Sequence, residues 1–259
     1  DFYNGIVKLN AALDVRKLVL DSSMEHLVDL EESAGQTNEL QATKAKTHTL
    51  LSQFYGSLNA SNMGDTDSAR VHQQNAITLY TNLIEDGAVE HHYDLALCYS
   101  QLANLDRLEK KYGDSLKNLE TALEHNSKLL QTNQDDKNAK RLDRRVLMTK
   151  LDVLIKLEDT KSVQELLTTL IESRKRAYQE SQNDLRLQRD YANILLRAGN
   201  VNLDAGNFDT SIDQYETALS AFKSLVASEP ENGRAPRDLA WGYYFLGEVY
   251  IVNDQHNVG

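Results

Sequence analysis

The sequence is poor in residues that interrupt helices or cross-link a chain. Its 259 residues include two prolines, Pro230 and Pro236, and one cysteine, Cys98. Because proline disrupts helix interiors, its scarcity favours long helices. One cysteine cannot form a disulfide within the chain, so cysteine usage leaves the redox compartment open. With 41% hydrophobic and 26% charged residues, the composition is typical of a chain with enough apolar surface for a core.

Long apolar runs and an excess of positive charge are also missing. No stretch approaches the roughly 18 apolar residues that a membrane-spanning helix needs. The formal net charge is −11, which argues against nucleic acid as a partner because phosphate binding requires clustered lysine and arginine. The sequence begins at Asp1 and no signal-peptide pattern follows, so we expect it to be a piece of something longer.

Small residues recur along the sequence at a nearly fixed spacing. The positions that define the repeat are Ser57, Ala103, Leu151, Gly199 and Gly247, which are 46, 48, 48 and 48 residues apart. Further small residues follow 12 and 19 positions later, as Ser211 and Ala218 follow Gly199, with a larger residue such as Tyr215 between them. Two antiparallel helices approach closely only where side chains are small, and the larger residue fills the next hole.

This pattern is that of the tetratricopeptide repeat (TPR), in which an A helix and a B helix form an antiparallel pair. A standard TPR has about 34 residues and HEAT repeats have about 40–47, so the period alone does not decide between them. The internal offsets favour a TPR whose helices are each about two turns longer. We therefore predict an all-α fold: a right-handed TPR-like superhelix (α-solenoid) of antiparallel helix pairs, with repeats of about 48 residues.

Turn-forming residues divide the sequence into helices. The expected A helices cover 37–60, 89–111, 139–157, 183–204 and 235–252, and the expected B helices cover 66–85, 113–131, 160–180 and 208–228. One or two lead-in helices at 4–33 end at Gly35, in an N-terminal segment 1–35. The array at 36–259 then has repeats at about 37–88, 89–136, 137–182, 183–233 and a truncated 234–259. Leu151 and Leu170 occupy small-residue positions in the third repeat, which predicts different packing there.

Several segments resemble a known family. They are RKLVLDSSMEHLVDLEESAGQTNEL (16–40), NMGDTDSA (62–69), RDYANILLRAGNVNLDAGNFDTSIDQYETAL (189–219) and RDLAWGYYFLGEVY (237–250). They are similar to the long repeats, and to the helical lead-in, that follow the kinase domain in some bacterial membrane-anchored serine/threonine kinases. The resemblance covers residues 15–259 and implies a sensory or docking region, in an extracytoplasmic or cytoplasmic location. A free-standing TPR adaptor or chaperone is the alternative.

No group of residues has the spacing of a catalytic or metal site. His91 and His92 are adjacent and would point about 100° apart on a helix, so they cannot share one metal ion. Cys98 is expected to be a buried structural residue. The sequence has no P-loop, nucleophile elbow, or kinase Gly-rich, HRD or DFG motif. We predict no catalytic residues, no metal and no cofactor; a helical enzyme is the least supported alternative.

The candidate ligand groove follows the A helices, which line the concave face of TPR arrays. By their spacing, the groove residues are Asn104, Asp152, Asn200, Glu248 and Tyr244. An asparagine amide both donates and accepts hydrogen bonds, so it could hold a peptide backbone. TPR domains that hold chaperone carboxylates have a lysine one turn before this asparagine. Ser100 and Leu196 stand there instead, so that clamp is not supported. The alternative for each groove residue is an ordinary half-buried helix position.

Five basic residues lie close together before and within the third A helix. They are Lys137, Lys140, Arg141, Arg144 and Arg145. Cations near a helix N-terminus oppose the helix dipole, so helix stability does not explain them. They form either a docking patch for an acidic peptide or surface, or a solvated face with ion pairs inside the helix.

The C-terminal helix carries an aromatic face. Its apolar residues are Trp241, Tyr244, Leu246, Val249 and Tyr250, and the B helix that would cover them is expected to begin near Asp254. Counting 12 residues from Gly247 reaches Gly259, where the sequence stops. We expect either further chain or a second copy of the molecule to cover this face. The predicted partners are therefore a protein or peptide in the groove and a homo-oligomer through the C-terminal helix.

Overall fold

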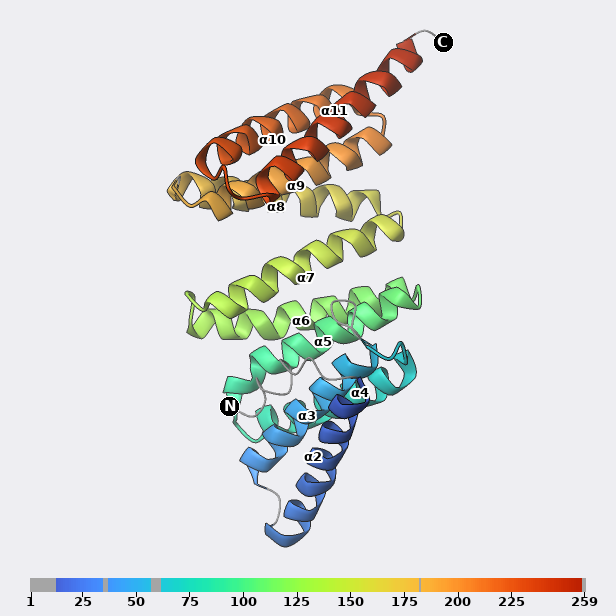
Figure 1. Cartoon of the computed structure of the whole chain (residues 1–259), viewed down its shortest axis with the longest axis vertical. Coiled ribbons are helices and arrows are strands. Elements are labelled where there is room, and N and C mark those ends of the chain that lie inside the picture. The colour runs from blue at the N-terminus through green and yellow to red at the C-terminus, as the bar shows by residue number, and fades with distance from the viewer. Residues whose placement is uncertain (1–12, 35–36, 57–61, 182, 258–259) are drawn as a thin grey trace. The chain divides into compact units, whose positions relative to one another are not determined.

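The structure, a computed structural model, describes residues 13–34, 37–56, 62–181 and 183–257 (Figure 1). These residues form helices and connecting turns, and no strand occurs among them. The predicted all-α fold is therefore confirmed. Three positions used in the sequence analysis, Gly35, Ser57 and Gly259, lie outside the described ranges. Within those ranges, no helix has the length and apolar character needed to cross a membrane.

The helices follow the predicted order. They are α2 (Leu13–Ala34), α3 (Asn38–Gly56), α4 (Thr66–Glu85), the short 3-10 helix η1 (Val89–His91), α5 (His92–Leu108), α6 (Tyr112–Thr132), α7 (Lys137–Lys156), α8 (Thr160–Glu180), α9 (Leu185–Asp204), α10 (Phe208–Ser228) and α11 (Arg234–Asn257). The B helices α4, α8 and α10 have the predicted bounds. The 3-10 turn η1 was not predicted and lies inside the segment expected to be helical from residue 89.

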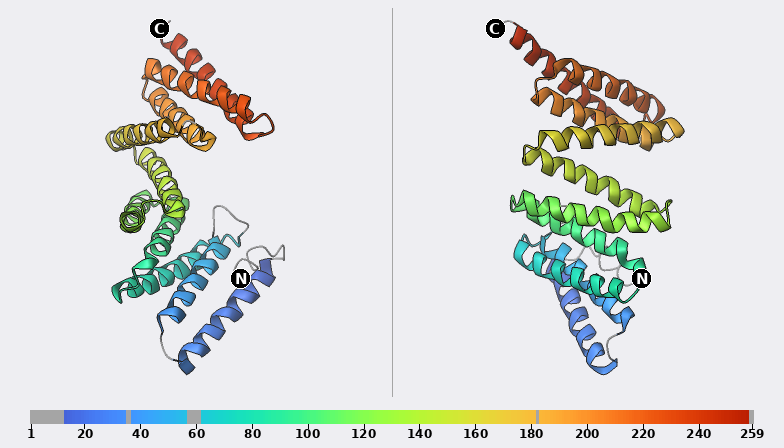
Figure 2. Two further views of the ribbon diagram at one scale, coloured as in Figure 1. Left: turned by 90° about the vertical axis from the view of Figure 1, so that its left-hand side faces the viewer. Right: turned by 180° about the vertical axis from the view of Figure 1, so that it is seen from behind.

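The chain divides into two compact units, residues 1–159 and 160–259, and each is described by itself. In unit 1, α3 pairs with α4 and α5 pairs with α6, while α2 packs on α3 and α7 on α6 (Figure 2). In unit 2, α9 pairs with α10, while α8 packs on α9 and α11 on α10. The division falls within the predicted repeat at 137–182, so α7 and α8 belong to different units.

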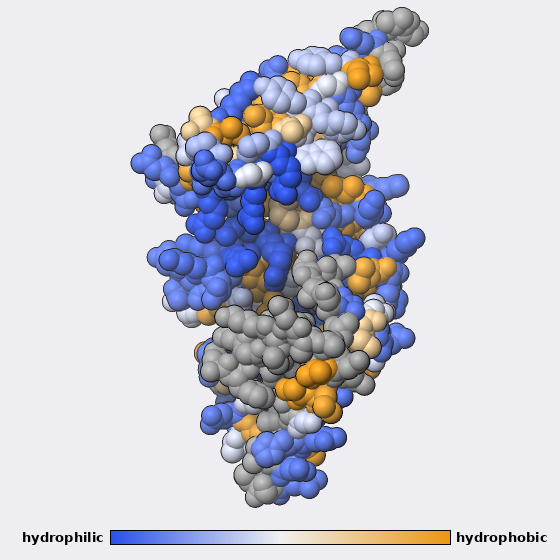
Figure 3. All heavy atoms as spheres, in the orientation of Figure 1, coloured by the Kyte–Doolittle hydropathy of each residue, from blue (hydrophilic) through white to orange (hydrophobic). Residues whose placement is uncertain are grey.

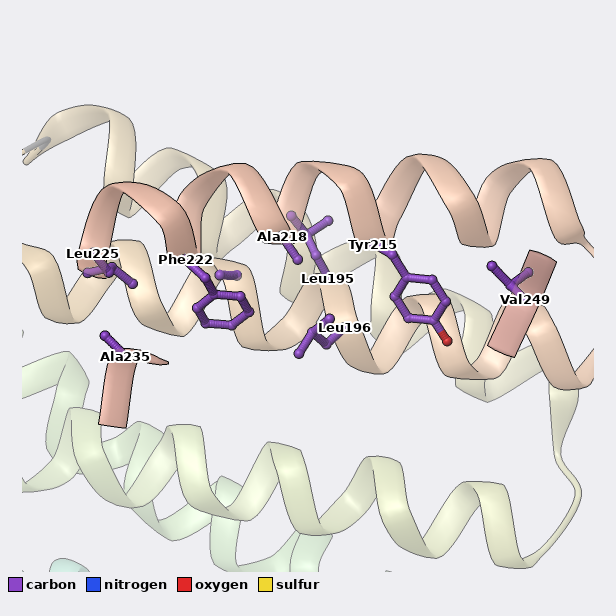
Figure 4. Close-up of a cluster of buried hydrophobic side chains, with 9 residues drawn as sticks. Leu195, Leu196, Tyr215, Ala218, Phe222, Leu225, Ala235 and Val249 are labelled. Atoms are coloured by element: carbon purple, nitrogen blue, oxygen red, sulfur yellow. The ribbon is translucent and has the colours of Figure 1, made fainter. Parts of the chain in front are cut away.

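Gly199, one of the small residues of the repeat, lies where its helix pair comes closest. A Cβ atom added to Gly199 of α9 would collide with the ring of Tyr215 from α10, and that ring is completely buried. Figure 4 shows Tyr215 and Phe222 of α10 in one layer with Leu195 and Leu196 of α9. Larger side chains therefore fill the space beside the points of closest approach.

A buried hydroxyl marks the same register in both units. In α6, Ser115 Oγ donates to the carbonyl of Ala103 at 2.8 Å, and in α10, Ser211 Oγ donates to the carbonyl of Gly199 at 2.8 Å. Because an unpaired hydroxyl would be costly to bury, these bonds explain how serine is tolerated at the interface.

The turns from A to B helices also repeat. Lys110, Glu158 and Gly206 each have a left-handed backbone, with φ of 59°, 56° and 76°, and they stand 48 residues apart. Only one of them is the glycine that this conformation favours. The turn therefore keeps its conformation at two non-glycine residues, Lys110 and Glu158.

The C-terminal helix differs from the prediction in two respects. The expected break near Asp254 is wrong, because α11 continues through this residue to Asn257. Val249 and Leu246 were expected on a bare face. Instead, Val249 is fully buried and Leu246 is half-buried, because both residues face the core shared with α10. Trp241, Tyr244 and Tyr250 are exposed as expected.

Candidate binding surface

A cleft of about 500 Å³ opens in unit 1 between the beginnings of two A helices, α3 and α5. Its lining residues come from α3, α4, the following turn with η1, and α5: Asn38, Glu39, Ala42, Thr43, Lys46, Tyr80, Ala88, Glu90, His91 and Asp94. The unpredicted turn η1 forms one wall, since it carries Glu90 and His91. The volume is in the range of sites that hold small molecules or short peptide segments.

The charges in this cleft are mostly negative. Glu39, Glu90 and Asp94 contribute carboxylates, against one lysine, Lys46. His91 also lines the cleft, and its Nδ1 lies 3.2 Å from Asp94 Oδ2. Its imidazole also packs on Tyr80, with the ring centroids 5.5 Å apart. The cleft therefore has an acidic rim, which is suited to a basic side chain, above the buried Tyr80.

Two of the predicted groove residues lie in the same unit. Asn104 is half-buried on α5, and Asp152 is half-buried on the neighbouring A helix α7. Arg107 of α5 reaches Asp152 with Nη1 3.5 Å from Oδ2, so the carboxylate is engaged between the two helices. Asn104 and the cleft residue Asp94 are ten residues apart, which is about 15 Å along α5.

The other predicted groove residues lie in unit 2. The Asn200 side-chain oxygen accepts a hydrogen bond of 2.6 Å from the Tyr215 hydroxyl, within the α9–α10 pair. Burial raises the pKa of Tyr215 to about 12, so this hydroxyl remains a donor at neutral pH. Tyr244 and Glu248 are exposed on α11.

The basic patch lies at the beginning of α7. Lys137, Lys140, Arg141 and Arg145 are exposed and Arg144 is half-buried. Asp136 caps the helix by accepting a hydrogen bond of 2.8 Å from the Ala139 amide, and Lys140 pairs with Asp135 at 2.9 Å. Figure 3 shows hydrophilic surface over this part of unit 1. The patch is thus accessible, with Lys140 engaged by an exposed carboxylate.

Two histidine pairs, which sequence spacing did not reveal, connect the helices of unit 1. His48 of α3 and His72 of α4 lie with their Nδ1 atoms 2.9 Å apart, and His92 of α5 and His125 of α6 repeat the same distance. A tyrosine seven residues after the first histidine stacks on the second: Tyr55 on His72 and Tyr99 on His125. His91 and His92 have different neighbours, in keeping with their predicted divergence.

Each histidine pair needs one neutral ring, because one Nδ1 must donate and the other accept. Burial, with the charges of His72 and Lys44, lowers the pKa of His48 to about 4. Burial also lowers the pKa of His92 and His125. Among the described residues, no group of three or more His, Cys, Asp or Glu side chains is arranged to hold a metal ion.

Cys98 is fully buried, as expected. Burial raises the pKa of its thiol to about 12, and its Sγ lies 3.5 Å from Thr49 Oγ1. A thiol with this pKa is almost entirely protonated at neutral pH and is therefore a poor nucleophile.

Comparison with known proteins identifies the fold. No protein-family model matches the sequence, and no curated protein matches it. Among solved structures, BtubC (BKLC) from P. vanneervenii is similar, with 13% identity over 96% of this chain and 93% of that one and a TM-score of 0.55. The apo form of RapI is similar with 13% identity over 99% of this chain and 70% of that one, and a TM-score of 0.54. These likenesses, together with the helix pairs, show a TPR-like α-solenoid.

Proposed function

We propose that the chain is a protein-binding scaffold that takes a peptide segment across the A-helix face of unit 1. The observation that carries this proposal is the cleft between α3 and α5, which has an acidic rim. The partner segment presents a lysine or arginine to Glu39, Glu90 and Asp94 and runs along α5 toward Asn104. An asparagine amide at that distance would hold the backbone of the next few residues of an extended peptide.

The basic patch extends the proposal. The patch at 137–145 is in the same unit as the cleft, and we propose that it contacts an acidic stretch of the partner. Asp152, which Arg107 engages, would contribute through the carboxylate oxygen that this contact leaves open. Asn200 remains a proposed groove residue of unit 2 by itself. In this proposal the protein binds and does not catalyse.

A finer proposal concerns the protein to which the segment belongs. The resemblance of its repeats to those that follow bacterial serine/threonine kinase domains supports a sensory or docking region of such a kinase. A free-standing TPR adaptor is the competing proposal. The complete gene distinguishes them: a kinase domain and a membrane span upstream of this segment favour the first, and their absence favours the second.

Peptide display on the purified chain, followed by calorimetry on the selected peptides, tests the site. We expect peptides with a basic residue to be selected. The variant Glu39→Gln with Asp94→Asn keeps the shapes of both side chains and should weaken binding at least tenfold, about 1.4 kcal/mol. Asn104→Ala should cost about 1–3 kcal/mol if its amide pairs with a buried backbone group of the peptide.

The matched control is Glu172→Gln, an exposed position on α8 in the other unit. It removes a carboxylate without touching the cleft, so affinity should not change. Peptides that bind the cleft variant as tightly as the original chain would place the binding site elsewhere.

A further inference from the structure

The C-terminal helix α11 has one packed face and one bare face. Gly242 and Val249 face α10, and a Cβ atom added to Gly242 would lie 2.8 Å from the Leu219 side chain. Away from α10, the large exposed side chains are Trp241 (52% exposed), Tyr244 (59%) and Ile251 (62%). Tyr243 (49%) and Tyr250 (44%) flank this bare face and also contact α10, through Lys223 and Glu216. Figure 3 shows residues of intermediate and high hydropathy gathered over this helix. Such a contiguous patch is typical of an interaction surface.

The residues of this bare face occupy the same repeat positions as residues that are buried on other A helices. Ala240, Tyr244 and Gly247 stand 48 residues after Ala192, Leu196 and Gly199, which lie under α10 in the α9–α10 pair. The equivalent residues of α5, Ala96, Ser100 and Ala103, are buried as well. In α11, Ala240 and Gly247 are exposed, and nothing lies within 4 Å of a Cβ atom built on Gly247. The face therefore has the form of a helix-binding seat that no described residue fills.

This seat is complementary to itself. Its central residues are Arg237, Ala240, Tyr244, Gly247, Ile251 and Asp254, spaced alternately three and four residues apart as in a coiled-coil seam. In an antiparallel pair of such helices, Tyr244 opposes Gly247 and Ala240 opposes Ile251. Each large residue therefore meets a small one, as Tyr215 meets Gly199 within the chain.

The charges and the helix length agree with the same pairing. In the register that sets Tyr244 against Gly247, Arg237 opposes Asp254 at both ends of the contact. Both are exposed residues of α11. The midpoint of α11, between Phe245 and Leu246, is also midway between Tyr244 and Gly247. One two-fold axis through that point therefore relates all these pairs.

We propose that α11 is a homodimerisation surface, on which the α11 helix of a second copy packs antiparallel across a two-fold axis. Trp241, Tyr244 and Ile251, with Tyr243 and Tyr250 flanking them, offer at most about 500 Å² per protomer, or about 1,000 Å² for the pair. This area is at the lower limit for a specific interface, so the dimer is a weak one with a Kd of about 1–10 μM.

Sedimentation velocity of the whole chain from about 1 to 200 μM covers the expected Kd. The protein should pass from monomer to dimer, and the emission of Trp241, the only tryptophan, should shift to the blue as its ring loses water. Gly247→Leu fills the small position on an exposed helix face and should raise the Kd at least tenfold without loss of helix. Gly113→Leu, also at an exposed helical glycine with open space around it, is the control and should leave the Kd unchanged.

A charge exchange tests the register. Arg237→Asp sets two carboxylates against each other at both ends and should raise the Kd about tenfold. Adding Asp254→Arg restores opposite charges and should return the Kd to within about threefold of the original value. Lys161→Asp, at an exposed lysine of α8, is the control for the change in net charge.

Three results would overturn the proposal. The first is a protein that stays monomeric throughout this range. The second is a dimer that Gly247→Leu does not weaken. The third is a monomer that binds a synthetic peptide of residues 208–228 on α11, because the seat would then take a separate B-type helix rather than a second copy.

Discussion

Gly199 sets the distance between α9 and α10 by having no side chain. In Gly199→Ala, the added methyl group would collide with the buried ring of Tyr215, whose hydroxyl is held by Asn200. Overpacking of this kind costs about 1–3 kcal/mol. Alanine also favours the helix by up to about 1 kcal/mol, which offsets part of that cost. We expect a net loss of about 1–2 kcal/mol in the free energy of unfolding, measured by urea denaturation.

Gly113→Ala is the matched control for this prediction. Gly113 is helical, and nothing lies within 4 Å of a Cβ atom built there, so only the gain in helix propensity should appear. If both substitutions change the unfolding free energy equally, the close approach at Gly199 does not limit the packing of α9 on α10.

The two histidine pairs connect A and B helices in unit 1 and make their packing sensitive to acid. Because burial lowers the pKa of His48 to about 4, the folded chain takes up a proton less readily than the unfolded chain, whose histidines titrate near 6.5. The stabilisation by the neutral ring is complete above pH 6.5 and is lost as pH falls toward 4. Since the rings are partly exposed, solvent screening reduces the effect, and we expect a loss of about 1–2 kcal/mol between pH 7 and pH 5.

Replacing one histidine of each pair by glutamine tests whether the histidine pairs cause this loss of stability in acid. His48→Gln with His92→Gln should flatten the dependence of the unfolding free energy on pH within that window, as urea denaturation at several pH values would show. His26→Gln, at an exposed residue of α2, is the control. An unchanged slope in the double variant would assign the acid sensitivity to other groups.

Helix positions followed from local sequence, whereas the contacts between helices did not. The bounds of α4 and α10 were predictable because turn-forming residues such as Asp65 and Asn207 stand directly before them. Asp65 even caps α4, by accepting a hydrogen bond of 3.0 Å from the Ser68 amide. The end of α11 was predicted wrongly because the repeat period required a turn near Asp254, where the local sequence contains no glycine or proline to break the helix.

The candidate site was predictable only in part. The repeat register identified Asn104 and Asp152 as positions on A helices. The cleft depends on η1 and on residues from α3 to α5 that are more than 50 positions apart. The histidine pairs likewise join residues 24 and 33 positions apart in the chain. Such separations follow no helical period, so only the packing of the helices reveals these contacts.

The division into two units has a consequence for how the whole chain unfolds. In helical-repeat proteins each element contacts only its neighbours, so stability is a sum of local contributions and unfolding need not be a single step. Each unit has its own buried core, including the cluster around Leu119 and Val146 in unit 1 and the cluster around Tyr215 and Phe222 in unit 2. We therefore expect the two units to unfold in separate transitions.

Trp241 makes this prediction testable, because the only tryptophan of the chain reports on unit 2, where it stacks on Phe245 with ring centroids 5.7 Å apart. Circular dichroism follows the helices of both units.

In unit 1, the Asp106 carboxylate is 2% exposed and lies 2.7 Å from Arg70, so Asp106→Ala should cost about 3 kcal/mol by leaving that guanidinium without this partner. At dilute concentration, Asp106→Ala should shift the dichroism curve to lower denaturant and leave the fluorescence curve in place. Phe222→Ala removes a buried ring from the core of unit 2 and should lower the unfolding free energy of that unit by about 3–5 kcal/mol. It should therefore shift the fluorescence curve instead. If Asp106→Ala shifts both curves equally, the two units unfold together in one cooperative transition, and the prediction of separate transitions is wrong.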